Sequence, residues 1–206
     1  MSLPPHLQPL SSSLQIDPDS FLKKWVEAKI EQREGSCVPD QMRFFVKFLM
    51  ENKNIKNVLE IGFNAGLSAG VFLATRTDIK LVSVDIGAHD YILKAQKLIQ
   101  KLFPDRFMLV VGDSSLVVPQ LKDLISPDLI FIDGAHHEPV VSLDLKNCLD
   151  MCRPGTWLLI DDYWPKGDHE PAVKKAVDAL VQTGKLVLLG QWSTPDRSWA
   201  LGKKIF

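Results

Sequence analysis

The chain has 206 residues, of which 46% are hydrophobic and 24% are charged, and its formal net charge is -1. A chain of this length can bury most of its apolar surface in one core, so a single domain is expected. The near-zero charge provides no general attraction to nucleic acid or to an anionic membrane, and it argues against both as partners.

Residues 1–16 are rich in proline and serine, and this composition predicts a flexible N-terminal segment. The segment has neither a basic start nor a continuous apolar run, and no later stretch is long enough to span a bilayer. Cys37, Cys148 and Cys152 are odd in number and lack a matching metal-ligand pair, so reduced and buried thiols are expected. Together these observations predict a cytoplasmic protein.

Two helices are expected over 17–52, ahead of the first strand. Asp17 and Pro18 form a helix start, and apolar residues then recur at helical spacing up to Gly35. A second helix is expected to begin at Pro39. The first helix is apolar enough to serve as a homodimer contact, and the sequence leaves the oligomeric state open.

From residue 57 onward, short apolar strands alternate with amphipathic helices. Strands are expected near 57–61, 80–85, 107–111, 128–132 and 156–160, and helices near 66–76, 90–102, 115–125, 138–152 and 169–182. Strands this apolar are typical of a parallel sheet covered on both faces. Two further strands, over 185–189 and 197–201, are joined by a short polar connection that permits only an antiparallel pair.

These elements predict one α/β domain over 17–206, built on a Rossmann-like, doubly wound sheet of seven strands. The sheet is expected to be mostly parallel, with an antiparallel C-terminal strand and with helices on both faces. Ligands of such a sheet bind beyond the carboxyl ends of its strands, so the polar residues at those ends are the candidates for a functional site.

The run from Glu60 to Gly66 predicts a cofactor-binding loop between the first strand and the following helix. Gly62 and Gly66 permit a tight turn and allow backbone N–H groups to approach a ligand at a helix N-terminus. With Asn64 between them the spacing is G-x-N-x-G, which differs from the G-x-G-x-x-G of dinucleotide sites. Glu60 would repel a phosphate but can hold an amine, so the loop favours S-adenosylmethionine (SAM), whose polar end is an amino acid.

Five successive strands end in acid. The acidic residues are Glu60, Asp85, Asp113, Asp133 and the pair Asp161 and Asp162. Asp85 stands 23 residues after Gly62, a distance at which an acid can accept hydrogen bonds from both hydroxyls of a ribose. Asp113 and Ser114 close the third strand where an adenine amino group would lie, and a helix-capping role is the alternative for either residue.

Several of these segments together resemble the class I SAM-dependent methyltransferases, over about residues 38–202. The matching positions are Glu60 to Gly66 with Ser68, Asp85, Gly112 to Ser114, and Arg153 to Gly155. Phe131 to His136, followed by Asp144 and Leu145, is similar to the I-D-G-x-H signature of a branch that includes antibiotic-pathway O-methyltransferases. Leu159 to Tyr163 is a second specific match.

The resemblance implies a cofactor site and a metal site. The SAM-binding residues would be Glu60, Gly62, Asn64, Gly66, Ser68, Asp85, Asp113, Ser114 and Asp133. The similar catechol O-methyltransferase group holds a magnesium ion with acids that correspond to Asp133, Asp161 and Asp162, so Mg²⁺ or another divalent cation is expected. The general base of that group corresponds to His136, with His137 as the alternative, so Asp133 and His136 are the expected catalytic residues.

These residues predict methyl transfer from SAM to a hydroxyl of a small molecule, with assistance from a divalent cation. N-methylation of a nucleic-acid base or a protein amine is disfavoured, because Ile132 to Ala135 stand where an N/D-P-P-Y/F motif would follow the fourth strand. A protein that binds SAM without turnover is the remaining alternative. No motif names the methyl acceptor.

Overall fold

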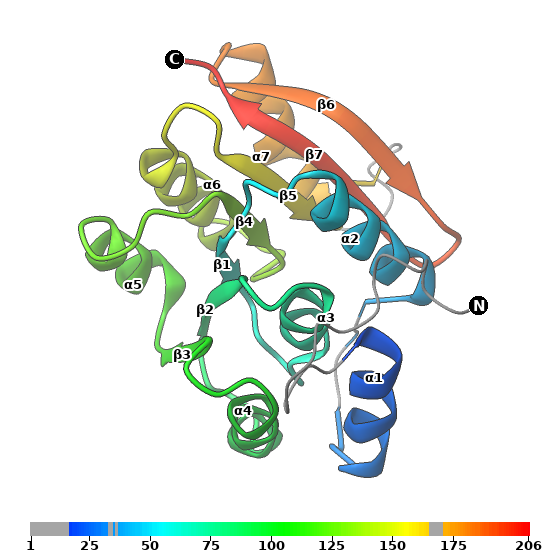
Figure 1. Cartoon of the computed structure of the whole chain (residues 1–206). Helices are drawn as coiled ribbons and strands as arrows, with labels where there is room; N and C mark the ends of the chain where they lie inside the picture. Colours follow the sequence, from blue (N-terminus) through cyan, green and yellow to red (C-terminus); the bar gives the residue numbers. More distant parts are fainter. Residues whose placement is uncertain (1–16, 33–34, 36, 165–170) are drawn as a thin grey trace.

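The computed structural model describes residues 17–32, 35, 37–164 and 171–206, so the predicted flexible segment 1–16 lies outside the described residues. A seven-stranded sheet forms the middle layer, with helices on both sides (Figure 1). The strands are β1 (Asn57–Ile61), β2 (Lys80–Asp85), β3 (Phe107–Val111), β4 (Leu129–Ile132), β5 (Trp157–Asp161), β6 (Leu186–Ser193) and β7 (Ser198–Lys204). The helices are α1 (Pro18–Glu27), α2 (Pro39–Glu51), α3 (Leu67–Thr75), α4 (Tyr91–Leu102), α5 (Ser114–Leu121), α6 (Val140–Met151) and α7 (Pro171–Gln182).

The strand order is β3-β2-β1-β4-β5-β7-β6. The first five of these are parallel to one another, whereas β7 runs antiparallel to both β5 and β6. The predicted fold class is therefore confirmed, including its antiparallel C-terminal strand. The order reverses between β1 and β4, and a doubly wound sheet binds its ligands at this switch point.

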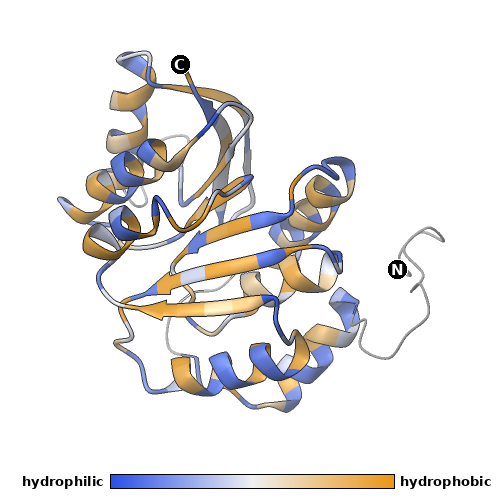
Figure 2. Ribbon diagram, turned by 60° about the vertical axis from the view of Figure 1, so that its left-hand side comes forward, coloured by the Kyte–Doolittle hydropathy of each residue, from blue (hydrophilic) through white to orange (hydrophobic). Residues whose placement is uncertain are grey.

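The two faces of the sheet hold separate hydrophobic clusters, because alternate side chains of a strand point to opposite sides. Helices α1 to α4 cover one face, where the ring centroids of Phe45, Phe72 and Phe131 lie 4.9 to 5.6 Å apart. Helices α5 to α7 cover the other face, against residues such as Ile61 and Ile132. Hydrophobic residues run along the strands (Figure 2), and their burial is the main stabilising contribution to the fold.

Element boundaries differ from expectation mainly where tertiary contacts decide them. The first helix ends at Glu27, before the expected limit at Gly35, and Lys29 beyond it has a positive φ of 48°. β6 continues to Ser193, four residues past its expected end, because its pairing with β7 resumes after an irregularity between Leu188 and Gly190 and runs to Ser193. Pairing of this kind leaves no local sequence signal.

Helix α1 packs against the rest of the chain through its apolar side chains. Phe21 is fully buried beside Gly70, where a Cβ atom would lie 1.9 Å from the phenyl ring. The Trp25 indole Nε1 donates a hydrogen bond of 2.9 Å to the carbonyl of Ala65. Because these side chains serve contacts within one chain, a homodimer through this helix stays a prediction.

The cysteines and the hydropathy of the helices agree with the sequence. Cys37, Cys148 and Cys152 are buried, and all three are unpaired thiols. None of the described helices is long and apolar enough to cross a membrane.

The loops after β1 and β4 touch at the switch point. The backbone N–H of Asp133 donates to the Ile61 carbonyl at 2.8 Å, and that of Gly62 donates to Val84 at 2.8 Å. Gly62 has a φ of +92°, and a Cβ atom there would lie 1.8 Å from the Asp133 carbonyl oxygen. A side chain at position 62 would therefore force the two loops apart.

We expect Gly62→Ala to lower the free energy of unfolding by at least about 3 kcal/mol, because it adds a steric clash to a left-handed backbone. Gly184→Ala is the matched control, since Gly184 also has a positive φ of +68°, but a Cβ atom there would meet no other described part of the chain within 4 Å. The control should cost about 1 kcal/mol. Chemical denaturation measures both, and equal losses would contradict the proposed contact.

Candidate active site

Acidic side chains from neighbouring strands share one face of the sheet. Glu60 lies opposite Phe131 in the register of β1 and β4, and Phe131 lies opposite Leu159 in that of β4 and β5. Two residues further along, Asp133 and Asp161 reach the same level. Because side chains alternate along a strand, Glu60, Asp133 and Asp161 point to the face that α1 to α4 cover.

Glu60 is fully buried at the start of the predicted cofactor loop, the run from Glu60 to Gly66 that is called the cofactor loop below. Its two carboxylate oxygens accept hydrogen bonds of 2.5 Å from the hydroxyls of Ser68 and Ser83. Burial raises the pKa of Glu60 to about 8, although both hydroxyls act in the opposite direction. Ser68 was predicted as a site residue and Ser83 was not, although a serine within an otherwise apolar strand is a usable signal.

Asp85 organises the cofactor loop. Its Oδ2 accepts hydrogen bonds from the backbone N–H groups of Phe63 and Asn64 at 3.0 and 2.8 Å. Its Oδ1 accepts one from Gly87 N–H at 2.8 Å. The acid thus holds the turn that follows β1, and its predicted contact with a ribose stays a prediction.

Asn64 links the cofactor loop to two other segments. Its Nδ2 donates to the carbonyl of Gly35 at 2.8 Å, and its Oδ1 accepts from the Tyr91 hydroxyl at 2.7 Å. Asn64 also has a positive φ of 48°, which asparagine tolerates better than most residues. An asparagine at the centre of G-x-N-x-G therefore has a structural role that glycine could not fill.

Asp113 caps α5. Its Oδ1 accepts hydrogen bonds from the backbone N–H of Ser115 at 2.9 Å and from the Ser115 hydroxyl at 2.7 Å. The capping alternative is thus confirmed for Asp113, while contact of Asp113 and Ser114 with an adenine stays a prediction. Ser114 is the first residue of α5 and stands at the same edge of the sheet.

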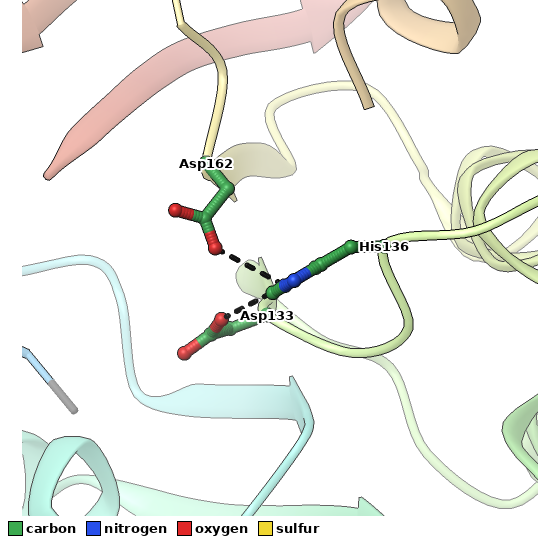
Figure 3. A group of neighbouring side chains, drawn as sticks. All are labelled: Asp133, His136 and Asp162. Atoms are coloured by element: carbon green, nitrogen blue, oxygen red, sulfur yellow. Dashed lines mark ion pairs between the residues drawn. The ribbon is translucent and has the colours of Figure 1, made fainter. Parts of the chain in front are cut away.

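Asp133, His136 and Asp162 come together beyond the ends of β4 and β5 (Figure 3). The His136 Nε2 lies 3.1 Å from Asp162 Oδ2 and 3.9 Å from Asp133 Oδ1. Each residue offers one atom to a group whose members all lie within 4.8 Å of one another, a spacing that suits a metal ion. The other oxygen of Asp162, Oδ1, lies 3.5 Å from the Arg197 guanidinium, a partner that no sequence pattern indicated.

The structure distinguishes between the two adjacent histidines. His136 points between the two carboxylates, whereas His137 is exposed and its Nδ1 lies 3.3 Å from the carbonyl oxygen of Glu138. Among the described residues, His136 is therefore the imidazole of the cluster.

Asp161 does not belong to this cluster, and its partner lies on α2. Its Oδ1 accepts a hydrogen bond of 2.6 Å from the amide Nε2 of Gln41, and both side chains are buried. Burial raises the pKa of Asp161 well above its usual range, and the nearby Asp133 and Asp162 add to the shift. Of the three predicted metal ligands, the structure thus brings Asp133 and Asp162 together with His136, while Asp161 is paired with Gln41.

The site as a whole is rich in acceptors. Glu60, Asp133, Asp161 and Asp162 are gathered at one edge of the sheet, and the basic groups paired with them among the described residues are His136 and Arg197. Carboxylates withdrawn from water are stabilised by a ligand that brings positive charge or hydrogen-bond donors. The arrangement therefore suits a sulfonium, an ammonium group or a divalent cation, and it disfavours phosphate.

The family model described as a methyltransferase domain matches residues 59–163, which include the cofactor loop, the acids and His136. This chain belongs to that methyltransferase family. No curated protein matches the chain at a significant level.

Solved structures share the fold over nearly the whole chain. An O-methyltransferase from Bacillus cereus, in complex with S-adenosylhomocysteine (SAH), is 17% identical at a TM-score of 0.73, with 96% of this chain and 93% of that chain covered. The Streptomyces achromogenes O-methyltransferase TomG, involved in tomaymycin synthesis and in complex with SAM, is 18% identical at a TM-score of 0.74, and the match covers 94% of this chain and 93% of TomG. An SAH-bound methyltransferase from Podospora anserina is 18% identical at 0.72, with 92% and 89% covered.

The raised pKa of Glu60 predicts a pH-dependent stability. Between the ordinary value of 4.5 and the folded value of about 8, the folded chain keeps a proton that the unfolded chain releases, so stability falls as the pH rises. Glu60→Gln removes this penalty of about 1.4 kcal/mol per pH unit. Denaturation at pH 5 and pH 8 should show the variant gaining several kcal/mol relative to wild type. Exposed Glu51→Gln is the control, and a parallel response of both variants would contradict the assignment.

Proposed function

We propose that this protein transfers a methyl group from SAM to a hydroxyl of a small molecule. The observation that supports this most directly is the meeting of His136 with Asp133 and Asp162 at the switch point, next to a G-x-N-x-G loop, in a chain of the methyltransferase family. The O-methyltransferases with SAM or SAH bound that share its fold are consistent with the same chemistry.

The proposed SAM site follows the acids along the sheet edge. Its residues are Glu60, Gly62, Asn64, Gly66, Ser68, Asp85, Asp113, Ser114 and Asp133. The buried carboxyl groups favour the ammonium and sulfonium groups of SAM, and Gly62 and Gly66 allow the backbone to approach the cofactor closely. Asp85 holds the loop in place through two of its N–H groups.

In the proposed reaction, His136 takes the proton of the acceptor hydroxyl, and the oxygen attacks the methyl carbon in line with the sulfur. A C–O bond forms as the C–S bond breaks, and SAH leaves while the proton stays on the imidazole. Asp133 and Asp162 stabilise the resulting imidazolium, since both carboxylates lie beside Nε2. Most of the rate gain should come from positioning, for which effective molarities of about 10⁵ M or more are known.

A divalent cation such as Mg²⁺ fits the same cluster, because carboxylate oxygens are the ligands it prefers. We assign it to Asp133 and Asp162, since His136 cannot bind a cation and accept a proton through the same nitrogen. Asp161, the third predicted ligand, would first have to leave Gln41. When bound, the cation would lower the pKa of a hydroxyl placed against it.

A small-molecule acceptor and a cytoplasmic location belong to the same proposal. The near-neutral net charge favours a small acceptor over nucleic acid. The three buried, unpaired thiols are typical of a reducing compartment.

We expect His136→Ala to lower kcat for methyl transfer at least 100-fold, the usual contribution of a general base, with little change in SAM affinity. His137→Ala is the matched control, because it removes the neighbouring, exposed imidazole. SAH formation over a panel of hydroxylated compounds measures transfer, and calorimetry measures SAM binding. Equal rates in the two variants would refute the role of His136.

Asp133→Asn and Asp162→Asn should each weaken Mn²⁺ binding at least about ten-fold. Removal of a residue that only hydrogen-bonds to a metal ligand already lowers metal affinity by about that factor. Mn²⁺ serves as a spectroscopic substitute for Mg²⁺, and electron paramagnetic resonance measures the free ion. Asp150→Asn removes an exposed acid of α6 and should leave binding unchanged. Wild-type affinity in all variants would remove the cation from the proposal.

A further inference from the structure

One buried acid has no part in the reaction described above. Asp144 lies in the second turn of α6 and is 1% exposed. Neither of its carboxylate oxygens accepts a hydrogen bond from the described residues. By contrast, Glu60 has two serine donors and Asp161 has Gln41. A buried carboxylate without donors is costly, so its retention calls for a state in which donors reach it.

Asp144 lies between two segments that carry residues of the proposed SAM site. On one side, the loop after β4 passes so close that a Cβ atom on Gly134 would lie 3.2 Å from Asp144 Oδ2. On the other side is the start of α5, where the Ser114 hydroxyl lowers the pKa of Asp144 and the Asp113 carboxylate raises it. The carboxyl group is therefore placed to contact both the loop after β4 and the start of α5.

The groups around Asp144 include donors that are not yet engaged. The backbone N–H groups of Gly134 and Ala135 donate to no other backbone group of the described residues. The Ser114 hydroxyl is close enough to Asp144 to lower its pKa, although neither carboxylate oxygen of Asp144 has a partner at full hydrogen-bond geometry. Asn147, one turn along α6, already ties this helix to α5 by donating to the Ser115 carbonyl at 3.1 Å. The carboxylate of Asp144 on α6 thus lies beside possible donors in α5 and in the loop after β4 that do not complete hydrogen bonds to it in this structure.

We propose that Asp144 is a positioning residue of the SAM site. When the cofactor binds, the Ser114 hydroxyl and the N–H groups of the loop after β4 donate hydrogen bonds to the Asp144 carboxylate. These bonds hold the start of α5 and the loop after β4 in position. This inference rests on the proposed function, since it concerns the same proposed SAM site. It gives Asp144 a role in cofactor affinity that does not require contact with the cofactor or with the reacting atoms.

The ionised form of Asp144 is the one that can accept all of these hydrogen bonds. Burial raises its pKa to about 6, with Asp113 adding to the shift, and Cys148 is the other titratable group beside it. Because protonation removes acceptor capacity, SAH affinity should fall as the pH drops through about 6. Asp144→Asn, which cannot ionise, should lack this part of the pH profile.

The test is SAH binding by calorimetry between pH 5 and pH 8, with wild type, Asp144→Asn and the control Asp150→Asn. We expect Asp144→Asn to bind about ten-fold more weakly at pH 7.5, as loss of hydrogen bonds to a charged group predicts, and to show a flatter pH profile. Asp150→Asn should follow wild type. An Asp144→Asn profile parallel to wild type, or a loss of thermal stability without a loss of affinity, would overturn the inference.

A thermodynamic cycle with Ser114→Ala provides a second readout, and Asp144→Ala, which also removes the carboxylate, replaces the asparagine variant if that variant does not fold. If the Ser114 hydroxyl acts through Asp144, the double variant should bind SAH with the affinity of whichever single variant binds SAH less tightly. Additive losses of SAH affinity would overturn the inference.

Failure of the wild-type protein to bind either SAM or SAH would remove the proposed function together with this inference. If wild type binds SAH and Asp144→Asn binds it equally well, the inference alone is removed.

Discussion

Withdrawal of several carboxylates from water at one edge of the sheet is the constraint on which the site depends. Each buried acid must be compensated, and the chain does so differently in each case. Glu60 receives two serine hydroxyls and keeps a proton up to a pKa of about 8, Asp161 receives the Gln41 amide, and Asp162 faces His136 and Arg197. What remains is a surplus of acceptors, which a cationic cofactor would satisfy.

The same acids oppose the stability of the fold. Glu60 destabilises the folded chain as it ionises, because it is buried at the start of the cofactor loop with no basic partner among its described hydrogen bonds. A sulfonium ligand would supply the missing charge, so binding and stability are linked through one group. Active sites commonly retain such unfavourable groups because function requires them.

The residues that contact the acids lie both inside and outside the family region. The methyltransferase family model spans residues 59–163, which hold the cofactor loop and His136. Gln41 on α2 and Arg197 before β7 lie outside that span, yet each one contacts an acid at the end of β5. Segments outside the family region therefore supply hydrogen-bond and ion-pair partners for acids that lie within it.

The sequence by itself determined the sheet and the acids at its edge. The bounds of β1, β2 and β3 agree with the apolar runs, because such runs end at turn residues. The rule that ligands bind at the carboxyl ends of strands then identified Glu60, Asp133 and Asp162 as candidate site residues.

Only the tertiary structure decided how the acids at the sheet edge are paired. Gln41 and Asp161 are 120 residues apart, and Ser83 reaches Glu60 from the neighbouring strand. Local patterns report burial and turns, but the partner of a buried charge depends on which segments the fold brings together.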